Sequence, residues 1–179
     1  FLDFEDNESG GWVRNNEDDA HNEFTLTDNY DEANTGDASL EVNAKFRFYP
    51  NDWGTYTEAI WAFDTPLDLS DFDEFRFFVY ILDAPTVTGS IQFSCALSDL
   101  PDGAAGKEVF QWDGDVDLLY GPVGEWYEVV IPFNRLVTPE WMTVVNGQLD
   151  AGSIYSFEFG VHGDSTAADS VRFLIDNLH

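Results

Sequence analysis

Carboxylates are the side chains of this sequence most able to do chemistry. Asp and Glu number 35, against 7 Lys and Arg and 3 His. Carboxylates bind divalent cations, and a pair of them can act as acid and base in hydrolysis. Asp176 stands out because it follows Val171, Phe173 and Ile175, which alternate as the apolar face of a strand does. A charge beside such an apolar tract is costly unless a cation or hydrogen bonds offset it.

Two acidic runs have part of the spacing of a calcium loop. Residues 113–117 alternate Asp, but Leu118 stands where an EF-hand needs glycine, and no Glu follows at the required distance. Residues 31–42 place Gly36 correctly but have Ala33 and Val42 at ligand positions. We interpret both runs as solvated loops.

The net charge of −28 restricts the classes of partner. Nucleic acids are bound through Lys and Arg at the phosphates, and anionic membranes and polyanionic polysaccharides would repel this chain unless a cation bridges them. The charge fits a surface suited to salt or a set of cation sites. We expect a monomer with neither nucleic acid nor membrane as a partner.

Cysteine and histidine offer little further chemistry. Cys95 is the single cysteine, so no disulfide can form within the chain, and we expect a buried thiol. Zinc and haem sites are disfavoured because only three His accompany it, His21, His162 and His179.

The elements that must position these groups are strands. Alternating segments recur along the chain, turn-rich stretches separate them, and no segment holds a convincing helical period. The longest apolar run, 77–82, is too short to cross a bilayer. We expect one all-β domain over residues 1–179, a mature or excised module folded as an antiparallel sandwich or barrel. The predicted strands are 1–5, 23–27, 38–46, 56–63, 74–82, 90–97, 108–112, 126–133, 154–161 and 171–178.

The alternation also predicts which side of each strand faces the core. In 154–161 the apolar face holds Phe157 and Phe159, and the opposite face holds Ser156, Glu158 and Gly160. The segment 56–63 is ambiguous, because Trp61 with Phe63 and Ile60 with Ala62 are both plausible inward pairs.

Five stretches, spread from the first predicted strand to the last, share one resemblance. They are 4–6 with Gly11-Trp12, then 36–42, 66–73, 125–133 and 173–178. In this order they resemble a jelly-roll carbohydrate-binding module. The resemblance implies a galactose-binding-like antiparallel β-sandwich of about ten strands in two sheets. It also implies a secreted, non-catalytic accessory domain that binds a polysaccharide and is joined to the catalytic domain of a parent carbohydrate-active enzyme.

The resemblance further implies a structural calcium ion. In such modules an acid of the first strand, a turn near the third strand and the Asp of the last strand hold it; here these are Glu5, the turn 36–39 and Asp176. Asp3 and Asp37 are further candidates. Ca²⁺ takes 6–8 oxygen ligands and would offset the repulsion among the carboxylates. The alternative is that Asp176 caps a strand end in solvent.

In this family the ligand lies across the concave sheet, which here would contain 56–63, 90–97, 108–112 and 154–161. Sugar rings present flat C–H patches ringed by hydroxyls, so a site needs aromatic plates beside planar polar groups. We expect a groove for a neutral plant β-glucan type of chain: mixed-linkage glucan, cellulose-like chains, xyloglucan or xylan. For Trp53 and Trp112, core packing is the alternative. The candidate residues are Trp53, Tyr56, Trp61, Gln92, Ser94, Trp112, Glu158 and His162.

Two other function classes stay open. A small jelly-roll glycoside hydrolase would need two carboxylates across the groove, and Glu58 with Glu158 is a possible pair. A purely structural or adhesive sandwich would use its aromatic residues only to fill the core.

Overall fold

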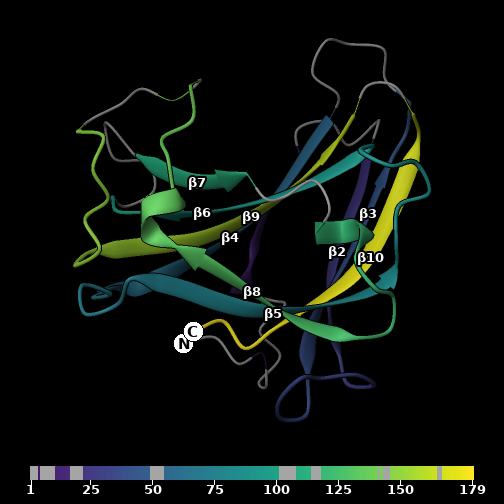
Figure 1. Cartoon of the computed structure of the whole chain (residues 1–179), viewed down its shortest axis with the longest axis horizontal. Helices are drawn as coiled ribbons and strands as arrows, with labels where there is room; N and C mark the ends of the chain where they lie inside the picture. The colour runs from purple at the N-terminus through teal and green to yellow at the C-terminus, as the bar shows by residue number, and fades with distance from the viewer. Residues whose placement is uncertain are drawn as a thin grey trace.

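A computed structural model describes residues 4, 11–16, 22–48, 55–100, 108–113, 118–140, 142, 146–164 and 167–179. Trp53, Glu5 and Asp3 lie outside these residues, so their expected roles stay predictions. In the described part, two antiparallel sheets face each other with the core between them (Figure 1).

The first sheet carries the predicted binding strands. Its strand order is β1-β4-β9-β6-β7, and the second sheet has the order β2-β3-β10-β5-β8. Two short 3-10 helices, η2 (Leu118–Tyr120) and η3 (Phe133–Arg135), flank β8. The strands are β1 (Val13–Asn16), β2 (Asn22–Asn29), β3 (Ser39–Phe46), β4 (Thr55–Leu67), β5 (Glu74–Asp83), β6 (Ile91–Ser98), β7 (Val109–Asp113), β8 (Trp126–Pro132), β9 (Ile154–Gly163) and β10 (Asp169–Asp176).

The predicted all-β sandwich is confirmed. Nine of the ten predicted strands match β2 to β10 with small shifts at their ends, and the predicted strand 1–5 lies largely outside the described residues. Strand β1 was not predicted, because Val13-Arg14-Asn15-Asn16 lacks an apolar alternation. In the described part of the chain, no helix is long and apolar enough to span a membrane.

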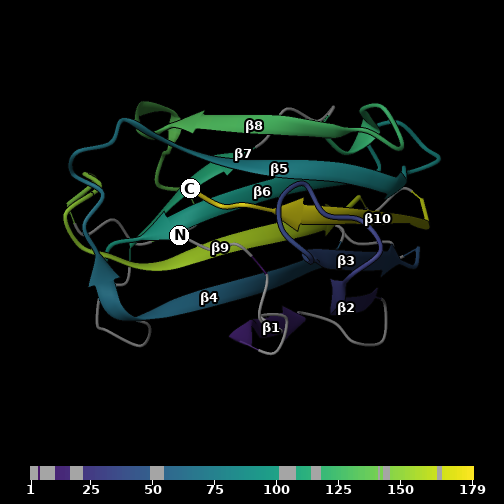
Figure 2. The same cartoon turned by 90° about the horizontal axis from the view of Figure 1, so that it is seen from below.

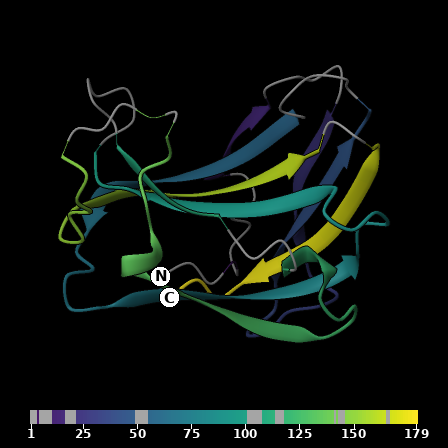
Figure 3. The same cartoon turned by 45° about the horizontal axis from the view of Figure 1, so that its top comes forward.

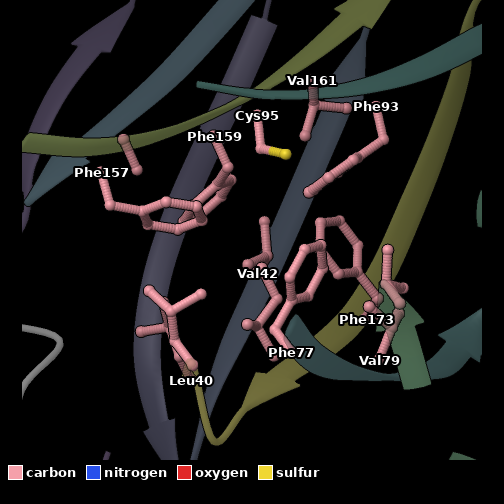
Figure 4. Packing of buried hydrophobic residues seen from close by; sticks show 14 of the residues in the cluster. Leu40, Val42, Phe77, Val79, Phe93, Cys95, Phe157, Phe159, Val161 and Phe173 are labelled. Carbon is pink, nitrogen blue, oxygen red and sulfur yellow. The ribbon is translucent and has the colours of Figure 1, made fainter. Parts of the chain in front are cut away.

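Aromatic side chains from both sheets fill the core. Phe93 of β6 stacks on Phe159 of β9 with ring centroids 6.2 Å apart, and it meets Phe173 of β10 edge-on at 6.0 Å. Cys95 is a buried thiol among them (Figure 4). Each fully buried ring contributes about 1.5–3 kcal/mol relative to an exposed one, so these contacts hold the two sheets together.

Ion pairs and a loop cover part of the outer face of the second sheet. Arg172 of β10 pairs with Glu41 of β3 at 2.8 Å, an exposed type of ion pair that contributes about 0–1 kcal/mol. The loop between β2 and β3 folds over this face, where Glu32 accepts a hydrogen bond from the Trp126 indole at 3.0 Å (Figure 2). The outer face of the first sheet is therefore the better candidate for ligand.

Candidate functional site

The strand register brings polar residues into rows across the first sheet. In one row, Glu58 of β4 lies opposite Gly160 of β9, and Gly160 lies opposite Ser94 of β6. Residues paired in this way point to the same face of the sheet. Since Phe93 and Phe159 point to the core, this row points outward.

The next row crosses four strands. Ile60 of β4, Glu158 of β9, Ala96 of β6 and Gln111 of β7 lie side by side on the outer face. Neighbouring strands are about 4.7–4.9 Å apart. A ligand that crosses the strands can therefore contact one side chain from each.

A hollow opens between these rows. Four strands contribute to it, and Figure 3 shows them curving together over the core. Its lining combines an aromatic ring, hydroxyl, amide and carboxylate groups, which are the groups that a sugar site needs. The lining residues are Tyr56, Glu58, Ser94, Cys95, Ala96, Val109, Gln111, Glu158, Phe159 and Gly160.

Tyr56 covers the glycine at the centre of the hollow. A Cβ atom added to Gly160 would approach the Oη, Cε2 and Cζ atoms of Tyr56 to within 3.0 Å, which real Cβ atoms essentially never do. The phenol ring thus lies across β9, in space that only glycine leaves free. A ring held across the sheet presents its open face to a ligand.

Glu158 makes the floor of the hollow acidic. Its side chain is only 5% exposed, and one carboxylate oxygen accepts a hydrogen bond from Ser156 Oγ at 2.8 Å. Glu58 lines the same hollow, whereas the described lining includes neither Lys nor Arg. The hollow therefore disfavours an anionic ligand and offers acceptors for hydroxyl groups.

The structure gathers some of the predicted binding residues in the hollow. Tyr56, Ser94 and Glu158 line it directly. His162 pairs with Tyr56, and Gln92 pairs with His162. Both therefore lie on the same outer face, in the row of Tyr56. These five residues therefore share one outer surface.

The two described tryptophans of the prediction lie elsewhere. Trp61 packs against the core, with its ring 5.6 Å from that of Trp12. Trp112 pairs with Cys95 and also packs against the core. Both point inward, away from the hollow. Gln111, the neighbour of Trp112, lines the hollow instead, and the strand pattern did not predict this.

The predicted calcium site is described only in part. Asp176 is fully buried rather than in solvent, and its Oδ2 accepts hydrogen bonds from the N–H groups of Asn34 and Thr35 at 2.8 and 3.0 Å. The last strand thus meets the segment before β3 at Asn34 and Thr35, and the calcium site stays a prediction. Asp37 is exposed. Among the described residues, no group of three Asp, Glu, His or Cys side chains could hold a metal ion. The donors present are of the kind that calcium prefers, but they do not complete a ligand set.

Comparison with solved structures shows the same fold in carbohydrate-binding modules. A family 11 carbohydrate-binding module from Clostridium thermocellum, in complex with a β-1,3-1,4-mixed-linked tetrasaccharide, is 14% identical with a TM-score of 0.67. The alignment covers 94% of this chain and 86% of that one. A family 28 module specific for non-crystalline cellulose is 18% identical with a TM-score of 0.61, over 98% of this chain and 90% of that one.

The same sandwich also occurs inside a larger enzyme. An exo-β-agarase is 18% identical with a TM-score of 0.55, and the match covers all of this chain but only 25% of that one. No protein-family model and no curated protein matched the chain. These likenesses establish the β-sandwich fold of carbohydrate-binding modules, which confirms the fold that the sequence resemblance implied.

Proposed function

We propose that this domain binds a single polysaccharide chain across the first sheet and does not cleave it. The observation that carries the proposal is the hollow, where the ring of Tyr56 lies among the planar polar groups of Glu58, Gln111 and Glu158. Stacking on the ring would hold the apolar face of a sugar, and the amide and carboxylates would accept or donate hydrogen bonds at its hydroxyls.

The ligand class is a neutral chain of the plant β-glucan type. Two glutamates in the hollow and a net charge of −28 would repel uronates and sulfated sugars. Mixed-linkage glucan, cellulose-like chains, xyloglucan and xylan satisfy this condition. Support comes from the family 11 module in complex with a mixed-linked tetrasaccharide and from the family 28 module specific for non-crystalline cellulose.

The biological setting forms part of the same proposal. We expect a secreted accessory domain of a carbohydrate-active enzyme, which would bring the catalytic domain to its polymer. The match within an agarase supports a place beside a catalytic domain. A calcium ion bound by Asp176, the turn before β3 and acids near the N-terminus would join the two ends of the domain without a part in binding chemistry.

Affinity electrophoresis tests the proposal. The domain should migrate more slowly in gels that contain barley mixed-linkage glucan, hydroxyethyl cellulose, xyloglucan or xylan, and normally in gels with pectate or alginate. Agarose belongs in the panel as a neutral galactan. Unchanged migration in every gel would refute polysaccharide binding.

A glycoside hydrolase is the second candidate, because Glu58 and Glu158 line the same hollow. Two carboxylates about 5–10 Å apart can cleave a glycosidic bond. Release of reducing ends from the same glycans, lost in Glu158→Gln, would favour the hydrolase. Retarded migration without any product favours the binding domain.

A further inference from the structure

The segment from Leu136 to Ala151 comes between η3 and β9 in the sequence, and its described residues lie beside the edge of the first sheet at β7. We call its described part, residues 136–140, 142 and 146–151, the wall. Figures 1 and 3 show it rising after η3 next to the ends of β6 and β7. Its place matters because β7 is the last strand of the sheet that carries the hollow.

The wall contacts both residues through which β7 lines the hollow. Gln111 and Val137 exchange two backbone hydrogen bonds, with N–H to carbonyl distances of 2.8 and 2.9 Å. The N–H of Val109 donates to the sulfur of Met142 at 3.1 Å. An edge strand normally leaves such groups open to solvent or to another strand. Here the wall satisfies them and continues the surface beyond β7.

Two buried carboxylates hold the far part of the wall. Glu108, which is 1% exposed and immediately precedes β7, accepts the N–H groups of Gly147 at 2.9 Å and Asn146 at 3.1 Å. Asp99, just after β6, accepts the N–H of Asp150 at 3.0 Å. The wall is therefore fixed to the sheet by two buried side chains.

The distance from the Tyr56 ring to β7 decides which ligands can reach the wall. The ring lies over Gly160 of β9, and from β9 to β7 there are two strand spacings, or about 10 Å. A disaccharide stacked on Tyr56 ends before β7. A hexasaccharide that follows the row from Ile60 to Gln111 reaches the wall.

We propose that Glu108 is a positioning residue of the glycan site, which holds the wall so that it forms the β7 end of the groove for long chains. This inference rests on the proposed function. Glu108 does not touch the ligand; it acts through the amides of Asn146 and Gly147. The wall contributes to affinity only when the chain is long enough to reach it.

The test compares Glu108→Gln with the wild-type domain on glucan oligosaccharides of two lengths. Calorimetry should show affinity for the hexasaccharide reduced about tenfold, and NMR titration should show affinity for the disaccharide unchanged within about twofold. Hydrogen exchange should become faster at the amides of Asn146 and Gly147. Glu128→Gln is the matched control, because this glutamate lies on the second sheet and pairs with Arg76 at 3.1 Å.

A second variant changes a residue of the wall itself and leaves Glu108 unchanged. Gly147 has a φ of 70°, where a side chain is strained, so Gly147→Ala should distort the wall while Glu108 stays intact. It should show the same loss for the hexasaccharide only, and the double variant should lose little more than either single variant. Wild-type affinity for the hexasaccharide in both variants, with the amides exposed, would overturn the positioning role. Absence of glycan binding by the wild-type domain would instead overturn the proposed function on which it rests.

Discussion

The ring of Tyr56 lies across the backbone of Gly160 on the neighbouring strand. The two residues are diagonal neighbours, because Tyr56 pairs with His162 and Glu58 pairs with Gly160. Any side chain larger than hydrogen at Gly160 would collide with the phenol ring. The glycine thus sets both the position and the tilt of the aromatic plate in the hollow.

Gly160→Ala should therefore damage the site through Tyr56. We expect the added methyl group to displace the ring, to reduce glycan affinity about tenfold, and to lower the free energy of unfolding by about 1–3 kcal/mol, as overpacking does. Calorimetry with a glucan hexasaccharide and urea denaturation measure both effects. Gly121→Ala is the control, since its Cβ would meet its nearest neighbours at an ordinary 3.5 Å. Unchanged affinity with a displaced ring would show that Tyr56 is not part of the site.

The strand pattern predicted much of this site, and the register supplied the rest. Alternation predicted that Ser94, Glu158 and His162 point outward from their strands, because the period of two fixes the face once the apolar side is known. The family resemblance, and not the alternation, implied that these strands share one sheet. It could not predict that Tyr56 covers Gly160, since that contact depends on how two strands distant in sequence align.

The positions that the sequence left open lie in segments with a weak pattern. In β4, Ile60 and Trp61 are both apolar, and the pairing of Trp61 with Phe157 and its contact with Trp12 show that Trp61 points inward. In the short strand β7, Trp112 was a binding candidate with core packing as the alternative, and its pairing with Cys95 turns it inward and Gln111 outward. A large ring in a short strand is more readily explained by the core that it fills than by a ligand.

Asp169 should make stability depend on pH below about 4. Burial alone would raise the pKa of its carboxyl, but hydrogen bonds from Ser90 Oγ and from the N–H groups of Val87 and Thr86 lower the pKa to about 2. The folded state therefore favours the charged form. Its contribution is fully present above the unfolded pKa of about 3.9 and is lost as the pH falls towards 2.

Asp169→Asn should accordingly lower the free energy of unfolding by about 1–2 kcal/mol at pH 7, after allowance for solvent screening at this partly exposed site. The difference from the wild type should shrink as the pH falls from 4 to about 2. Urea denaturation across this range measures it, with the exposed Asp71→Asn as the control. A difference that stays constant with pH would mean that the hydrogen bonds do not depend on the charge.

Asp99 should behave in the opposite way. Burial, together with the nearby charges of Glu108 and Asp150, raises the pKa of its carboxyl, although the N–H of Asp150 lowers it. One oxygen, Oδ1, is buried without a hydrogen-bond partner among the described residues. The charged form is thus disfavoured in the folded state, and stability falls as the pH rises from the unfolded pKa through the raised one.

Asp99→Asn removes this charge while its side-chain oxygen can still accept the N–H of Asp150. We expect the variant to unfold at a higher temperature than the wild type at pH 7, with an advantage that disappears at low pH. Calorimetric melting at pH 7 and pH 4 measures the change. A variant that is less stable at pH 7 would show that the charged form holds the wall better than the neutral amide does.

We expect the proposed calcium ion to stabilise the domain through Asp176. Its buried carboxylate already accepts the N–H groups of Asn34 and Thr35 through Oδ2, so a bound cation would join β10, the turn before β3 and the N-terminal acids. Binding to the folded state alone adds RT ln(1 + [Ca²⁺]/Kd) to the free energy of unfolding, or about 2.7 kcal/mol at a hundredfold excess over Kd.

The melting temperature of the wild type should therefore rise with added CaCl₂ and fall with EDTA. The melting temperature of Asp176→Asn should change with neither. Glu158→Gln should keep the full response to CaCl₂, because Glu158 lies on the first sheet. If the wild-type domain melts at the same temperature in CaCl₂ and in EDTA, the calcium proposal is wrong. The hydrogen bonds from Asn34 and Thr35 would then stabilise the Asp176 carboxylate without a metal ion.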